Sequence, residues 1–230
     1  MIAVISDVHG NYPALKSVIQ DIHKYGCERI ISLGDIVGYY CMVNECIDLC
    51  RKENVVNILG NHDYYLISGD GCPRSYSVNI CIRYQTSVIT KQNIEWLKNS
   101  VDLIENEFFS MRHGGWKNPL DEYINEFSFE MVKGYSQSVF ASGHTHKQVI
   151  KKNKKKTYFN PGSVGQPRDY DSRAAYAIIN DNSEVILKRI KYPINETIEI
   201  MRERGFQDRI SECLLRGTRI GEEVDTFEVI

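Results

Sequence analysis

Short apolar runs alternate with amphipathic stretches along the first quarter of the chain. Each run ends abruptly in polar residues, as a buried parallel strand does when it opens into a turn. Asn11 and Pro13 mark the start of a helix with apolar residues on one face, and Gly26 marks its end. The strands are expected at residues 2–6, 29–33 and 55–59, and the helices between 12 and 26 and at about 43–52. This βαβαβ order predicts a parallel sheet with right-handed crossovers.

The rest of the chain is patterned less regularly. Glycine and proline mark a loop at residues 69–73, before a helical stretch that includes Ile82, and a short helix is expected around Trp96. Further strands are expected at residues 107–112, 138–142, 148–150, 157–159, 174–179 and 184–190. The last four are closely spaced and predict a mostly antiparallel second sheet. The tail from Ile194 predicts two amphipathic helices that separate at Gly205.

Length and composition favour a single domain of 230 residues, with a core over residues 1–191 and a C-terminal helical extension over residues 192–230. The formal net charge is −2 and charged residues make up 25% of the chain. Composition therefore gives no global argument for binding nucleic acid or a membrane surface, and any anionic ligand must be held by local groups.

The cysteines indicate a reducing compartment. There are seven, an odd number, and no Cys-x-x-Cys pair, so we expect free thiols. Cys46 and Cys50 lie one helical turn apart and are interpreted as buried small residues, with metal ligation as the alternative. The N-terminal apolar stretch reaches Asp7 too soon for a signal peptide, and no run approaches the roughly 20 apolar residues of a membrane span. We therefore expect a cytoplasmic protein.

Potential metal ligands follow the expected strands. Five of the six histidines lie in polar turns at strand ends, whereas His23 lies within a helix. The residues gathered there are Asp7, His9, Asp35, Asn61, His62, His113, His144 and His146. One loop histidine alone is most simply a hydrogen-bonded one, but the whole set favours a metal site. Carboxylate, imidazole and amide ligands without thiolate suit Mn, Fe, Zn or Ni better than a structural zinc cage.

These residues fall in short motifs. In chain order the motifs are Asp7-x-His9, Gly34-Asp35-x-x-Gly38, Gly60-Asn61-His62-Asp63, His113 and Gly143-His144-x-His146. With these motifs the chain resembles the calcineurin-like metallophosphoesterases over about residues 1–180. The stretches at residues 33–39 and 160–169 resemble the small bacterial and archaeal branch of that family.

The resemblance implies an α/β fold, a four-layer αββα sandwich of two mixed β-sheets flanked by helices, with two divalent metals at the carboxyl ends of the strands. It implies one metal held by Asp7, His9 and His146 and a second held by Asn61, His113 and His144, with Asp35 bridging. Mn²⁺ is favoured, and Fe, Zn or Ni are alternatives. A hydroxide shared by two cations about 3.5–4 Å apart would attack phosphorus. His62 would contact the phosphoryl or leaving oxygen and act as a general acid.

Two positions depart from the protein-phosphatase branch of the family, in which an Asp-Arg pair orients the histidine and grips phosphate. Gly38 and Tyr39 stand there instead. Asp63 is therefore a candidate to orient His62, and Arg168 is a candidate to bind the phosphoryl group, aimed by the rigid turn before it. The alternatives for this arginine are to cap its own loop or to form a salt bridge with Asp169 or Asp171.

The lysine run at residues 151–156 lies between two expected strands. It is interpreted as a solvated hairpin, with a steering patch for a polyanion as the alternative. Aromatic residues near the strand ends offer a surface on which a base could stack, although packing is the simpler interpretation.

The sequence therefore predicts a two-metal phosphoesterase that hydrolyses phosphomonoesters or phosphodiesters of small molecules, with nucleotides favoured. A nuclease or a dinucleoside polyphosphate hydrolase is the alternative within the enzymes. A non-catalytic metal-binding interaction scaffold is the alternative in a different class. No membrane partner is expected, and an edge strand or the outer helices could pair two copies as a homodimer.

Overall fold

The N-terminal apolar run forms strand β1 (Ile2–Ile5) at the centre of a five-stranded sheet. The computed structural model describes residues 1–221. β1 pairs in parallel with β2 (Arg29–Ser32) and β2 pairs in parallel with β3 (Val56–Asn57), through helices α1 (Tyr12–Lys24) and α2 (Val43–Lys52). The predicted βαβαβ unit is confirmed.

The late strands divide between two sheets, so the predicted antiparallel second sheet is wrong. Strands β9 (Ala174–Ile179) and β10 (Val185–Ile190) extend the first sheet, where β9 lies antiparallel to β1. The first sheet has the order β10-β9-β1-β2-β3. Every residue of β9 is buried, which suits a strand with neighbours on both edges and layers on both faces.

The second sheet is mixed. It has the order β4-β5-β6-β8-β7 and is built from β4 (Ile104–Glu105), β5 (Phe109–Arg112), β6 (Val139–Ser142), β7 (Gln148–Lys152) and β8 (Thr157–Pro161). β5, β6 and β8 are parallel, whereas β4 and β7 are antiparallel to their neighbours. The lysine run forms the end of β7 and its turn into β8, so the predicted hairpin is confirmed.

Alternation along the strands separates the layers. In β1, Val4 packs between the sheets, while Ala3 and Ile5 pack against α1 and α2. In β6, Ala141 packs between the sheets and Phe140 faces outward. The segment 116–135 covers the outer face of the second sheet. All of this segment is described, and its one regular element is the 3₁₀ helix η1 (Phe129–Val132). The predicted four-layer α/β sandwich is confirmed.

Residues 61–98 form three helices beside the first sheet. These are α3 (Asn61–Ser68), α4 (Tyr76–Val88) and α5 (Lys91–Lys98). The last two match the predicted helical stretches. α3 was not predicted, because its buried first turn is the polar sequence Asn61-His62-Asp63, which carries no apolar periodicity.

The tail differs from its prediction in the described residues. Helix α6 (Ile194–Glu203) is present, and Gly205 has the left-handed φ of 82° expected at a helix end. Two short 3₁₀ helices follow, η2 (Asp208–Ile210) and η3 (Glu212–Leu215), in place of a second α-helix. A three-residue apolar spacing suits either helix type, so the pattern did not distinguish them. Residues 222–230 of the predicted extension lie outside the described part.

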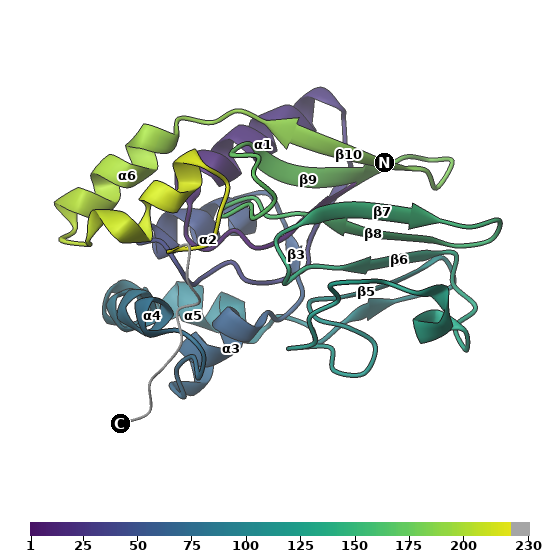
Figure 1. Ribbon diagram of the computed structural model, residues 1–230, viewed down its shortest axis with the longest axis horizontal. Coiled ribbons are helices and arrows are strands. Elements are labelled where there is room, and N and C mark those ends of the chain that lie inside the picture. The colour runs from purple at the N-terminus through teal and green to yellow at the C-terminus, as the bar shows by residue number, and fades with distance from the viewer. Residues whose placement is uncertain (222–230) are drawn as a thin grey trace.

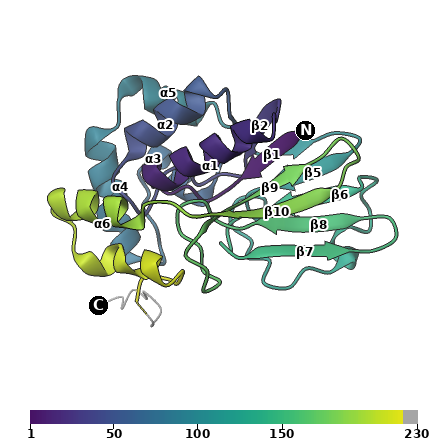
Figure 2. The same ribbon diagram turned by 90° about the horizontal axis from the view of Figure 1, so that it is seen from above.

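The helices gather toward one end of the molecule, and the turn between β7 and β8 lies at the other (Figures 1 and 2). Within residues 1–221, no helix combines the length and the apolar character needed to cross a bilayer. All seven cysteines lie within the described residues and are thiols, and Cys46 and Cys50 are buried in the core beside the first sheet, as predicted.

Candidate metal centre

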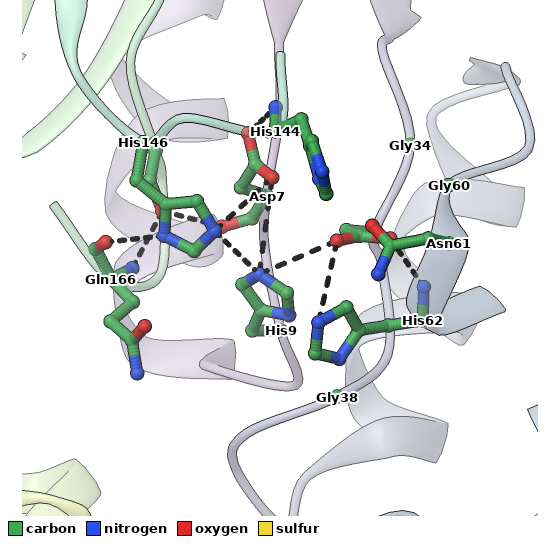
Figure 3. Close-up of polar contacts among 12 residues, drawn as sticks. Asp7, His9, Gly34, Gly38, Gly60, Asn61, His62, His144, His146 and Gln166 are labelled. Atoms are coloured by element: carbon green, nitrogen blue, oxygen red, sulfur yellow. Dashed lines mark hydrogen bonds and ion pairs between the residues drawn. The ribbon is translucent and has the colours of Figure 1, made fainter. Parts of the chain in front are cut away.

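The polar residues of the five motifs converge at one edge of the sandwich, where strands of both sheets end. Asp7 and His9 follow β1, and Asp35 follows β2. Asn61 and His62 open α3. The remaining members, His113, His144 and His146, follow β5 and β6. Figure 3 shows the side chains that surround His9, contributed by segments far apart in the sequence. All eight side chains are buried.

The turns that carry these residues have an uncommon backbone conformation. Five of the eight residues have a positive φ, between 52° and 66°: Asp7, His9, Asp35, His144 and His146. Aspartate and histidine enter the left-handed region more readily than most residues, yet each such residue costs roughly 1 kcal/mol. Strain gathered in this way is typical of a functional site.

Asp7, His9 and His146 form the first cluster. The His9 Nε2 and His146 Nε2 atoms lie 3.1 Å apart, and the His146 Nε2 atom lies 3.4 Å from Asp7 Oδ1. Asp7 Oδ2 is held by the Ser6 hydroxyl at 2.6 Å and by the backbone N–H of His144 at 3.2 Å. Asp7 Oδ1 is buried and has no hydrogen-bond partner within residues 1–221, and it faces the cluster.

Asp35, Asn61, His113 and His144 form the second cluster. The His113 Nε2 atom lies 3.1 Å from His144 Nδ1, 2.9 Å from Asn61 Oδ1 and 3.4 Å from Asp35 Oδ2. The same Asp35 oxygen lies 3.7 Å from His9 Nε2 in the first cluster, and it has no hydrogen-bond partner in the part of the chain that the structure describes. One carboxylate oxygen therefore lies between the two clusters.

Backbone carbonyls orient three of the imidazole rings. The Nδ1 atoms of His9, His113 and His146 lie 2.9, 2.8 and 2.7 Å from the carbonyl oxygens of Val37, Leu33 and Gln166. A carbonyl only accepts, so each Nδ1 must carry the proton and donate it. Each Nε2 atom then turns an unshared electron pair toward its cluster.

A pair of divalent cations fits this arrangement. Two nitrogens bound to one cation at about 2.1 Å lie roughly 3 Å apart, which matches both histidine pairs. Burial lowers the pKa of His9, His113 and His146 well below the ordinary value, so these imidazoles are neutral. Burial raises the pKa of Asp7 to about 7 and raises the pKa of Asp35 far above its ordinary value. The clusters can bind metal. A cation would supply the positive charge that stabilises the ionised forms of the Asp7 and Asp35 carboxylates.

His62 lies beside the clusters and is packed by rings. Its Nε2 atom is 3.9 Å from Asp35 Oδ2, and its ring centroid lies 4.7 Å from that of His9 and 5.1 Å from that of Tyr39. Its Nδ1 atom is buried, and none of the described residues forms a hydrogen bond with it. Asp63 therefore does not orient this ring, and that prediction is wrong. The Asp63 carboxylate instead accepts backbone hydrogen bonds from the turns around the site.

Arg168 lies over the ring of Tyr39, with its Cζ atom 5.3 Å from the ring centroid. It donates to the side chain of Gln166 at 3.0 Å and is only 9% exposed. The alternative of a salt bridge with a following aspartate is wrong, because Asp169 pairs with Arg189 and Asp171 pairs with Arg173.

A cavity of about 340 Å³ opens beside the second cluster, and Arg168 lies in its wall. It is lined by Tyr39, Asn61, His62, Cys72, Arg74, Ser75, Tyr123, Asn125, Arg168, Arg219 and Ile220. Two side chains of the candidate centre and three arginines therefore line the same cavity. Arg74 and Tyr123 were not predicted, because isolated loop residues carry no periodicity or motif.

Comparisons with other proteins agree with this geometry. A profile of the calcineurin-like phosphoesterase superfamily domain matches residues 1–184. An uncharacterised protein of Methanocaldococcus jannaschii is 32% identical over 240 residues, covering 94% of this chain and 98% of that protein. The structure of a metallophosphoesterase from Sphaerobacter thermophilus is 28% identical with a TM-score of 0.83, covering 94% of this chain and 99% of that one.

A hypothetical protein of Pyrococcus horikoshii has the same fold, with a TM-score of 0.80 at 19% identity, covering 95% of this chain and all of that one. The resemblance expected from the motifs is confirmed by the profile, which covers most of the chain. The chain belongs to the calcineurin-like phosphoesterase superfamily.

Proposed function

We propose that this protein is a two-metal phosphoesterase that hydrolyses phosphomonoesters or phosphodiesters of small molecules, with nucleotides as the favoured class. The observation that carries the proposal is the position of Asp35 Oδ2, which lies 3.4 Å from His113 Nε2 and 3.7 Å from His9 Nε2. An unpartnered carboxylate oxygen between two imidazole clusters is the arrangement that a pair of cations sharing one ligand requires.

Each of the two clusters would supply the ligands of one cation. Asp7, His9 and His146 would hold one cation, Asn61, His113 and His144 the other, and Asp35 both. Mn²⁺ is the favoured metal, since oxygen and imidazole ligands suit it, and Fe, Zn or Ni are alternatives. When bound, the pair supplies an activated water and neutralises charge on the phosphoryl oxygens.

His62 is proposed to contact the phosphoryl or leaving oxygen. Burial lowers the pKa of His62 well below its ordinary value, so the ring is neutral at pH 7 and carries one N–H donor. The ring lies in the cavity wall next to Asn61, where a substrate would reach it. A hydrogen bond from the neutral His62 ring to the leaving oxygen would stabilise the negative charge that develops there as the ester bond breaks, and water would supply the proton.

Arg168 and Tyr39, which also line the cavity, are proposed to hold the phosphoryl group. The Arg168 guanidinium lies over the Tyr39 ring. Its Nε and Nη2 atoms donate to Gln166, and the guanidinium has further N–H groups that can donate to a ligand. An arginine in this position offers two parallel hydrogen bonds to a phosphoryl group. The cavity beyond has room for more than a phosphate, which supports a substrate with a sizeable leaving group.

Hydrolysis by metal-stripped protein, reloaded with Mn²⁺, tests this function. The panel is a bis-aryl phosphate, an aryl monophosphate, a 2′,3′-cyclic nucleotide and a dinucleoside tetraphosphate. We expect metal-dependent turnover that His62→Ala abolishes and that His23→Ala, on the surface of α1, leaves unchanged. Turnover without added metal would contradict the proposal. Two metals bound with no turnover on any substrate would favour the non-catalytic scaffold.

A further inference from the structure

His144 is oriented differently from the other histidines of the two clusters. His9, His113 and His146 each turn Nε2 inward and donate from Nδ1 to a backbone carbonyl. His144 turns Nδ1 inward, 3.1 Å from His113 Nε2. Its outer nitrogen, Nε2, is buried and has no hydrogen-bond partner among the described residues. The outer nitrogen of this ring therefore needs a different acceptor.

The carboxylate of Asp121 faces that nitrogen. Asp121 Oδ1 lies 3.4 Å from His144 Nε2, slightly beyond hydrogen-bond length. The ring of Tyr123, two residues along the same loop, packs against the His144 ring with 3.8 Å between centroids and an angle of 39° between the ring planes. This ring contact and the carboxylate together limit how far the imidazole can turn.

Arg74, which lies in the cavity wall, holds Asp121 in place. Its Nη1 atom donates to Asp121 Oδ2 at 2.9 Å and its Nη2 atom donates to Oδ1, which makes a bidentate pair. Arg74 lies between α3 and α4, whereas Asp121 lies in the loop between β5 and β6. The pair thus ties two segments far apart in the sequence together at the rim of the centre.

We propose that Asp121 is a positioning residue for the second metal, and that it accepts a hydrogen bond from His144 Nε2–H while Arg74 fixes the carboxylate. With a cation at Nδ1, the remaining proton of the ring must reside on Nε2, where Asp121 is the available acceptor. A carboxylate behind a metal-bound imidazole fixes its orientation and increases its basicity, and its loss typically weakens metal binding about 10–100-fold. The inference rests on the proposed two-metal function.

Titration of the metal-free protein with Mn²⁺, followed by calorimetry and by the EPR signal of free Mn²⁺, tests the inference. We expect two sites in the wild type. Asp121→Asn should weaken one of them about 10-fold or more and leave the other unchanged. Asp208→Asn is the matched control, because Asp208 also forms a bidentate pair with an arginine, Arg202, outside the centre. It should bind both metals as the wild type does.

Arg74→Gln provides a second variant that leaves the carboxylate in place. It should weaken the same site by a smaller factor, since Asp121 is then free to turn away. Unchanged affinity at both sites in Asp121→Asn would overturn the inference. So would equal weakening of both sites with a lower melting temperature of the metal-free protein, which would indicate a structural role. Failure of the wild type to bind two metals would instead contradict the proposed function.

Discussion

The carboxylate of Asp63 accepts a hydrogen bond from the backbone N–H of Asp35, with 3.0 Å between nitrogen and oxygen. It also accepts from the backbone N–H groups of Val37 at 3.1 Å and Gly60 at 3.2 Å. One buried carboxylate thus joins the turn after β2 to the start of α3. The residue beside the proposed catalytic histidine therefore shapes the loops of the centre rather than the imidazole.

Asp63→Asn should destabilise the protein. An amide has one oxygen to accept these hydrogen bonds, and its NH₂ group would face backbone donors, so we expect a loss of about 1.5–3 kcal/mol in the free energy of unfolding. Urea denaturation measures this loss, with the exposed Asp48→Asn as the control. A large fall in kcat at unchanged stability would instead mean that Asp63 acts through His62.

Gly38→Ala should disrupt the centre by steric conflict. A Cβ atom at Gly38 would lie 2.4 Å from His9 Nδ1 and 2.7 Å from His62 Nδ1, and the backbone φ is 136°. Both rings would have to move, so we expect activity to fall at least about 100-fold, since small displacements of reacting groups have effects of this size.

Gly26→Ala is the matched control for this variant. Gly26 also has a positive φ, 63°, but nothing lies within 4 Å of an added Cβ atom. It should cost roughly 1 kcal/mol of stability, the penalty of a left-handed backbone, and keep full activity. Equal activity of the two variants would show that the contact with the histidines does not matter.

The strand ends could be predicted from the sequence because each depends on local order. An apolar run followed at once by Asp7 and His9 indicates both the buried strand and the polar turn at its end. Sheet membership of β9 depends on a long-range pairing, Ala3 with Ile178, that no local pattern contains. Asp121 was missed for the same reason, since its partners Arg74 and His144 are distant in the chain.

Arg168→Ala should weaken substrate binding. The guanidinium stacks on Tyr39 in the cavity wall and would lose its hydrogen bonds to the phosphoryl group, so KM should rise about 10-fold, as for one lost charged hydrogen bond. Steady-state kinetics and inhibition by inorganic phosphate both measure the change. Arg173→Ala, which removes a surface partner of Asp171, is the control. Unchanged KM and phosphate affinity would exclude Arg168 from the phosphoryl site.

As pH rises, metal binding should strengthen, whereas the stability of the metal-free protein should fall. Burial raises the pKa of Asp7 to about 7, whereas its unfolded value is about 3.9. The metal-free folded protein thus binds a proton that the unfolded chain does not, and this stabilisation is lost as pH rises through about 7. The raised pKa of Asp35 acts in the same direction. The neutral histidines act in the opposite direction, because the unfolded chain still binds protons there at its pKa of about 6.5, and this effect becomes small above about pH 7.

We therefore expect the melting temperature of the metal-free protein to fall between about pH 7 and pH 8. The increase in melting temperature caused by Mn²⁺ should grow over the same range, because the cation displaces those protons. Differential scanning calorimetry with and without Mn²⁺ measures both trends. A metal-induced increase that does not vary with pH would mean that both carboxylates are already ionised in the metal-free protein.

The lysine run should not contribute to substrate binding. Asn160, near the end of β8, donates to the carbonyl of Gly143 beside the centre at 2.7 Å, whereas the lysine turn precedes the first residue of that strand. Four residues of strand span about 13 Å, which exceeds the screening length of about 8 Å at physiological ionic strength. Lys151 and Lys156 also donate to the backbone carbonyls of Phe127 and Val132.

The double variant Lys154→Glu/Lys155→Glu reverses two exposed charges of this turn. We expect unchanged kcat/KM for an aryl phosphate and unchanged binding of a fluorescein-labelled single-stranded oligonucleotide, measured by anisotropy at low and physiological salt. A basic patch that contacts phosphates would lose affinity in this variant, and the loss would be greatest at low salt. Weaker oligonucleotide binding with unchanged aryl phosphate kinetics would therefore identify the turn as a polyanion-binding patch and favour a nuclease.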